Sequence, residues 1–192
     1  MNRVVYLTGA PASGKSTVSR KLAEAVPELL VFEYGKELTK HLETRATGLT
    51  QEELRTKSSK VAAPAEIAVV DQTMLSFVEK NRSVRPVIID SHAVTKEHYG
   101  YRITPFKLTE FQALGPTDIW VLYTSPEVAV SRIDADAAGR PPISEYEASF
   151  HTSLQASVAI TYGMYCGVPV HLFDSSHSLE SLSDELARRL RR

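Results

Sequence analysis

Residues 4–17 read VVYLTGAPASGKST, and this stretch decides the fold. Its apolar start is typical of a buried strand, and residues 9–16 fit G-x-x-x-x-G-K-[S/T] at every fixed position. Glycines let the backbone curl tightly and aim N–H groups at anionic oxygens, while the N-terminus of the following helix adds partial positive charge. The stretch therefore predicts a strand, a phosphate-binding loop and a helix that together hold a nucleoside triphosphate.

The side chains of this loop suit the same ligand. Lys15 can reach the β- and γ-phosphates, and the Ser16 hydroxyl can ligate the Mg²⁺ ion that accompanies the nucleotide. Because the motif occurs in kinases, GTP switches, motors and transporters, it does not choose the reaction. The predicted ATP-binding residues are Gly9, Ala10, Pro11, Ala12, Ser13, Gly14, Lys15, Ser16 and Thr17.

Short apolar runs alternate with longer helical patterns along the rest of the chain. The predicted strands are residues 4–8, 29–34, 86–90, 119–124 and 168–173. The predicted helices are residues 15–26, 126–135, 145–166 and 178–191. Residues 35–47 and 51–81 are expected to hold two or three more, with breaks near TGLT and at Pro64. This alternation predicts an α/β fold with a central five-stranded parallel sheet, its strands mostly buried and covered by helices on both faces. We expect a single domain over residues 1–192, because no repeat or long linker divides it.

The bulk composition excludes several classes of protein. The net charge is −1, so no basic excess indicates a nucleic-acid partner. No apolar run approaches the roughly 20 residues that a membrane-spanning helix needs, and no secretory signal pattern is seen. The single cysteine, Cys166, favours a reducing compartment, so we expect a cytoplasmic protein without a membrane partner.

Charged residues that follow the strands indicate phosphoryl transfer. Asp90 ends the strand at 86–90, where a carboxylate can hold the water shell of Mg²⁺ or orient an acceptor. Arg132 and Arg140 lie by a Gly/Pro-bearing break, residues 134–144, which is typical of a lid that closes over a triphosphate and excludes water. The predicted catalytic residues are Lys15, Asp90, Arg132 and Arg140, and the predicted metal ligands are Ser16 and Asp90.

The remaining features favour a small kinase over the other P-loop classes. No N-K-x-D segment follows a late strand, as a guanine-reading switch would require. A helical insert, residues 35–81, separates the second and third predicted strands. We expect this insert to bind the acceptor of the phosphoryl group.

Several segments together resemble the archaeal-type adenylate kinases, a branch of the P-loop nucleoside monophosphate kinases. These segments, which cover nearly the whole chain, are VVYLTGAPASGKST, FEYGKEL, EELRTKS, VIIDSHAVTKEHYGY, PTDIWVLYTSPEVAVSRI and AITYGMYCGVPV. The resemblance implies transfer of the γ-phosphoryl group of Mg·ATP to AMP, giving two ADP, by an intracellular protein that is often a homo-oligomer. The acceptor-binding residues that it implies are Gly35, Arg55, His92, Lys96 and Tyr101. Arg102 is added to them from RITPF, which stands where the family has a Leu/Gly/Pro-rich turn, because its charge can partly replace the charge that the chain lacks elsewhere.

The chain also departs from the family pattern. Ala138 stands where the lid carries a second arginine, and Gln155-Ala156 stand where the next helix carries another. A second interpretation is therefore a kinase for a different small molecule, in which Asp90 is the general base toward a hydroxyl. A third is a nucleotide-binding regulator that hydrolyses ATP slowly.

Overall fold

The computed structural model describes residues 2–44, 63–136 and 141–191. Its strands are β1 (Val4–Gly9), β2 (Leu30–Glu33), β3 (Val87–Asp90), β4 (Val94–Glu97), β5 (Gly100–Ile103), β6 (Asp118–Tyr123) and β7 (Val170–Asp174). Its helices are α1 (Lys15–Ala25), α2 (Tyr34–Glu43), α4 (Pro64–Asn81), α5 (Leu108–Leu114), α6 (Pro126–Asp134), α7 (Glu145–Cys166) and α8 (Leu179–Leu190).

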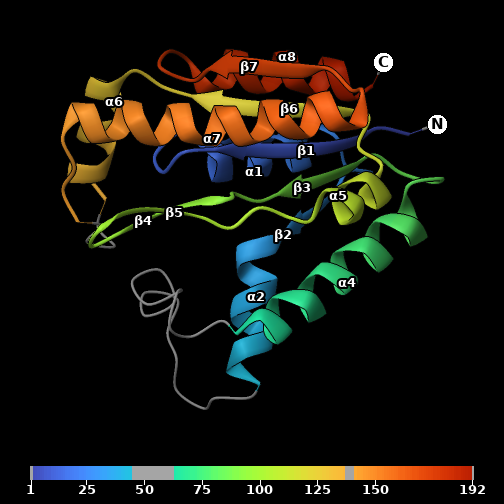
Figure 1. Ribbon diagram of the computed structural model, residues 1–192. Helices are drawn as coiled ribbons and strands as arrows, with labels where there is room; N and C mark the ends of the chain where they lie inside the picture. The colour runs from blue at the N-terminus through green and yellow to red at the C-terminus, as the bar shows by residue number, and fades with distance from the viewer. Residues whose placement is uncertain (1, 45–62, 137–140, 192) are drawn as a thin grey trace.

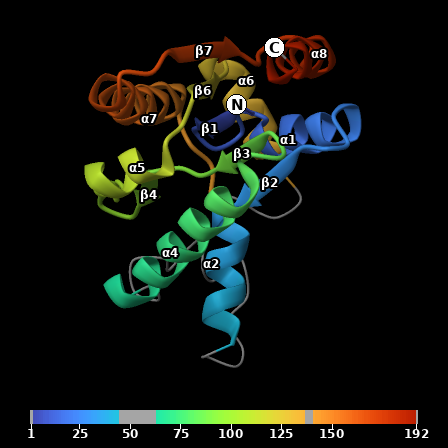
Figure 2. The same ribbon diagram turned by 90° about the vertical axis from the view of Figure 1, so that its right-hand side faces the viewer.

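The central sheet has five strands in the order β2-β3-β1-β6-β7, and every neighbouring pair is parallel. Figure 2 looks along this sheet and shows α7 and α5 on one side of it and α1 and α8 on the other. The predicted fold class, a five-stranded parallel sheet covered on both faces, is therefore confirmed. The carboxyl ends of the strands meet at one edge, where ligands bind in such sheets.

Alternate side chains of the strands divide the core into two layers. Val4 and Tyr6 of β1 face a cluster formed with α4, α5 and α7, whereas Val5 and Leu7 face a cluster formed with α1 and α8. The aromatic ring of Tyr162 on α7 stacks on Phe111 of α5 with centroids 4.0 Å apart. Each layer covers one face of β1, which explains why this strand is buried along its whole length.

Helices α2 and α4 project beyond β2 as an arm (Figure 1). The Tyr34 hydroxyl at the start of α2 donates to Asp71 of α4 at 2.7 Å, and His41 pairs with Glu66 farther along the arm. Pro64 occupies the first turn of α4 rather than breaking a helix, as suits a residue without a backbone donor. The arm is the described part of the predicted acceptor insert.

Three features of the fold differ from the sequence-based expectation. The antiparallel hairpin β4–β5 and the short helix α5 were not predicted, because the hairpin strands are short and polar and depend on distant contacts with α7. Strand β7 is less buried than expected, since it forms an edge of the sheet and leaves Leu172 50% exposed. Every helix among the described residues is too short or too polar to cross a lipid bilayer.

Candidate active site

The phosphate-binding loop joins β1 to α1 at the carboxyl edge of the sheet. Gly14 takes a left-handed conformation with φ 82°, and α1 begins at Lys15 directly after it. A Cβ atom on Gly9 would lie only 2.4 Å from the Leu122 carbonyl oxygen, so this position has no room for a side chain. The two glycines thus permit a tight turn that points the first N–H groups of α1 out of the sheet.

Lys15 at the start of α1 and Asp90 at the end of β3 lie at the same edge of the sheet. The Lys15 Nζ donates to the Gly9 carbonyl at 3.3 Å, and the Ser19 hydroxyl on α1 lies 3.5 Å from Asp90 Oδ2. Burial raises the pKa of the Asp90 carboxyl, the Lys15 ammonium opposes this increase, and the Glu33 carboxylate adds to it. A carboxylate beside a lysine at this edge can hold the hydrated cation of a nucleotide.

Glu33 stands beside Asp90, and sequence reasoning did not include it among the site residues. In the parallel pairing of β2 and β3, Glu33 is directly opposite Asp90. The Lys36 Nζ on the first turn of α2 donates to Glu33 Oε1 at 2.6 Å. The signal that identified Asp90, an acidic residue directly after an apolar strand, also applies to Glu33 after LLVF.

Arg132 of α6 contacts the outside of the phosphate-binding loop. Its guanidinium donates to the Ala12 carbonyl at 3.0 Å and to the Ser175 carbonyl at 2.7 Å. The Ser175 hydroxyl in turn donates to the Ser13 carbonyl at 2.8 Å. Ala12 has φ 63°, an uncommon value for a residue with a side chain, so these bonds hold the loop in a strained shape.

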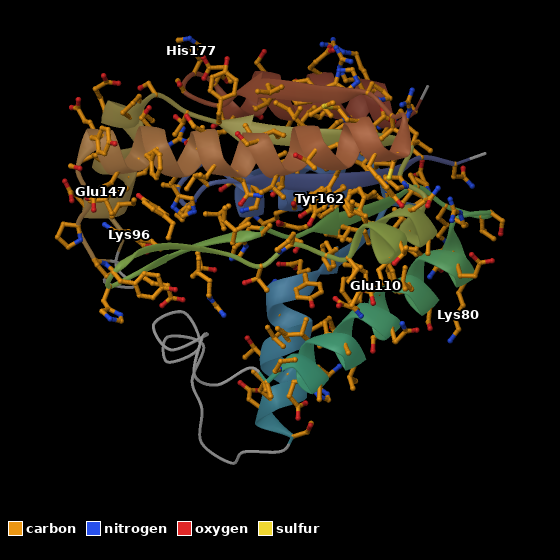
Figure 3. The ribbon with its side chains drawn as sticks, viewed as in Figure 1. Lys80, Lys96, Glu110, Glu147, Tyr162 and His177 are labelled. Carbon is orange, nitrogen blue, oxygen red and sulfur yellow. The ribbon has the colours of Figure 1, made fainter. Side chains whose placement is uncertain are left out.

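The residues implied for the acceptor on the hairpin are engaged with neighbouring side chains. Lys96 pairs with Glu147 of α7 at 2.7 Å, as Figure 3 shows, and the Tyr101 hydroxyl donates to the Glu147 carbonyl at 2.8 Å. Arg102 pairs with Glu97 at 3.2 Å. The contacts of Lys96 and Tyr101 fix β4–β5 to the first turn of α7, and the pair of Arg102 and Glu97 lies within the hairpin.

Gln155 on α7 has a different environment from that of a phosphate-binding arginine. It is 1% exposed, donates to the Thr8 hydroxyl at 2.8 Å and accepts from the Val94 N–H at 3.1 Å. The His151 ring also bonds the Val94 carbonyl at 3.1 Å, and burial lowers the pKa of this imidazole. Gln155 therefore ties the hairpin to β1 inside the protein.

The other predicted residues are distributed as follows. Arg55 and Arg140, and the departure at Ala138, lie outside the described residues. Gly35 is on α2, and a Cβ atom added there would have no neighbouring atom within 4 Å. His92 follows β3 and is exposed. Within the phosphate-binding loop, the exposed residues are Pro11 and Ser16, the partly exposed ones are Ala12, Gly14, Lys15 and Thr17, and the buried ones are Gly9, Ala10 and Ser13. The functional roles of all these residues stay predictions.

Comparison with known proteins assigns the chain to a family. Residues 8–148 match the AAA domain family, so the chain belongs to that family. No curated protein matches the sequence.

Solved structures with the same fold span the entire chain. A "putative kinase" from Chloroflexus aurantiacus J-10-fl is similar with a TM-score of 0.59 and 18% identity over 99% of this chain and 96% of the other. A sugar kinase from Janibacter sp. HTCC2649, in its unliganded form, is similar with a TM-score of 0.55 and 15% identity over 100% and 95%. These likenesses show that the chain shares its fold with these two proteins.

Proposed function

We propose that the protein is an ATP-dependent phosphotransferase that moves the γ-phosphoryl group of Mg·ATP to a small acceptor. The observation that carries this proposal is that Lys15 of the phosphate-binding loop and the Asp90 carboxylate lie at one edge of the sheet, close enough to interact electrostatically, beside a helical arm. Backbone N–H groups and Lys15 neutralise the phosphates, and the arm provides a second surface near the same edge of the sheet. The kinases that share the fold support this assignment.

The oxygen donors of the site fit magnesium. Ser16 is exposed on the first turn of α1, and Asp90 faces that helix through Ser19. In the described part of the chain no three His, Cys, Asp or Glu side chains gather as a metal site. Mg²⁺ commonly uses one or two carboxylates together with water and phosphate oxygens, so it would arrive with ATP and be held by Ser16 and Asp90. When bound, it would supply charge neutralisation between the β- and γ-phosphates.

The first candidate acceptor is a nucleoside monophosphate, with AMP the expected one. The resemblance to the archaeal-type adenylate kinases carries this candidate, and the arm of α2 and α4 supports it by lying beside β2. The acceptor's phosphate would depend on Arg55, the arginine that the resemblance assigns to it.

The second candidate acceptor is a small molecule with a free hydroxyl group. Glu33 favours it, because a second carboxylate beside Asp90 repels a phosphate but can accept a hydrogen bond from a hydroxyl. The two described cations predicted to bind the acceptor, Lys96 and Arg102, are moreover paired with Glu147 and Glu97.

A turnover panel tests the proposal and separates the candidates. Purified protein with Mg·ATP is assayed against each nucleoside monophosphate and against sugars, polyols and nucleosides, with ADP release and phosphorylated product both measured. Lys15→Ala should lose ATP binding and all turnover, because it removes the cation that reaches the phosphates. Arg55→Ala should abolish transfer to AMP and spare transfer to a neutral hydroxyl. Slow ATP hydrolysis that no acceptor changes, and that a protein partner stimulates, would instead indicate a nucleotide-binding regulator.

A further inference from the structure

We propose that Glu33 is the catalytic carboxylate for the acceptor, and that the acceptor is an uncharged molecule whose hydroxyl group binds this carboxylate. The inference rests on the proposed phosphotransferase function and specifies its acceptor. It assigns Asp90 and Glu33, which end neighbouring strands, to different tasks.

The order of the strands determines which carboxylate faces which substrate. The order β2-β3-β1 places Asp90 next to the phosphate-binding loop and Glu33 one strand farther away. Since parallel strands lie about 4.8 Å apart, Glu33 is roughly 10 Å from the strand that carries the loop. That separation leaves room for a transferring phosphoryl group and the hydroxyl that receives it.

Both carboxylates face the same side of the sheet. Residues opposite one another in neighbouring strands share a face, and Val31, two residues before Glu33, packs with the cluster that includes Val18 of α1. Asp90 reaches Ser19 on that same helix. Glu33 therefore projects toward the phosphate-binding side of the sheet rather than toward α4, α5 and α7.

The surroundings of the two carboxylates differ in a way that fits two tasks. Asp90 is next to Lys15 and Ser19, the partners expected for a group that holds hydrated Mg²⁺. The Glu33 side chain is 37% exposed, and its Oε1 accepts a hydrogen bond from Lys36 at 2.6 Å. Its second oxygen can accept a hydrogen bond from a substrate hydroxyl, and Lys36 keeps the carboxylate oriented.

Charge at this edge selects against an acceptor that already bears a phosphate. Glu33 and Asp90 place two carboxylates directly opposite one another on neighbouring strand ends, so both add negative charge to this edge of the sheet. Lys36 offsets the charge of Glu33, whereas Lys15, the cation beside Asp90, is the one expected to bind the ATP phosphates. A neutral hydroxyl acceptor adds no further negative charge, whereas a monophosphate would add up to two.

The transfer step balances with these groups. The acceptor oxygen forms a bond to the γ-phosphorus as the bond between that phosphorus and the β–γ bridging oxygen breaks. ADP leaves with the electron pair of the broken bond, and the hydroxyl proton passes to Glu33. Glu33 then releases this proton to solvent. The product is a phosphate ester of the acceptor.

The test compares Glu33→Gln with Glu28→Gln, which changes the same residue type before the amino end of the same strand, where it is exposed. Both variants and the unmodified protein are assayed with Mg·ATP against neutral hydroxyl compounds and nucleoside monophosphates. We expect a neutral compound to be phosphorylated. For that compound, Glu33→Gln should lower kcat by about 100-fold or more, the usual contribution of a general base. Glu28→Gln should stay within about twofold.

Two further measurements distinguish a chemical role of Glu33 from a structural one. The KM for ATP and the melting temperature of Glu33→Gln should stay close to those of the unmodified protein.

The alternative outcomes are distinguishable. Phosphorylation of a nucleoside monophosphate at equal rates by Glu33→Gln and the unmodified protein would overturn the role of Glu33 and leave the phosphotransferase proposal intact. Absence of any phosphorylated product from either class of acceptor would overturn the phosphotransferase proposal, and this inference with it.

Discussion

Replacing Gln155 by leucine should destabilise the protein, although its position in the sequence resembles that of a substrate-binding arginine. The change keeps a similar side-chain volume and removes two buried hydrogen bonds, to the Thr8 hydroxyl and the Val94 N–H. All three residues are at most 1% exposed, so water does not replace the lost partner. Each unsatisfied buried group costs about 1–3 kcal/mol, and a rotating hydroxyl is at the low end, so the expected loss is about 2–4 kcal/mol.

Thermal and urea unfolding measure this loss. For a chain of this size each kcal/mol lowers the melting temperature by about 2–4 °C, so a decrease of about 4–16 °C is expected. Ser153→Ala is the matched control, because its hydroxyl returns to the Ser149 carbonyl on the exposed side of the same helix. That variant should stay within about 0.5 kcal/mol of the unmodified protein. If Gln155→Leu unfolds at the same urea concentration as Ser153→Ala, the internal role that we assign to Gln155 is wrong.

Two further predictions concern the phosphate-binding loop and the hairpin. Arg132→Ala should weaken ATP binding by about tenfold or more, because one charged hydrogen bond to the loop carbonyl contributes about 1.5–3 kcal/mol. Calorimetry measures this affinity, and Arg20→Ala, which changes an exposed arginine on α1, is the control that should leave it unchanged. An affinity of Arg132→Ala equal to that of the control would contradict the prediction. Hydrogen bonds from Lys96 and from the Ser144 backbone lower the pKa of Glu147 from its ordinary 4.5 to about 2. Because the folded value is below the unfolded one, the stabilisation is complete above pH 4.5 and disappears as pH falls toward 2. The difference in unfolding free energy between Glu147→Gln and the unmodified protein should therefore narrow over this interval in urea titrations, and a difference independent of pH would refute the assignment.

Local sequence patterns were sufficient to predict the strands and helices that surround the candidate site. The run VVYLT followed by the glycine-bearing loop predicted β1 and α1, because each pattern carries its own periodicity and turn chemistry. The helix predicted at residues 145–166 is observed as α7 with the same bounds, and Ser144 and Glu147 form a capping box at its start. The hairpin β4–β5 was missed, because its strands are four residues each and carry charges instead of an apolar alternation.

The sequence by itself predicted a triphosphate-binding loop, because the loop and the start of α1 are contiguous and local physics shapes them. Only the tertiary structure decided which residues lie beside that loop. Glu33 meets Asp90 through the register of two parallel strands, and Arg132 meets the Ala12 carbonyl across 120 residues. Gln155 points into the core because α7 packs its inner face on β1. Such contacts depend on strand order and helix packing. These bring together segments that are distant in the sequence, so neither segment carries a local sequence pattern that predicts the contact.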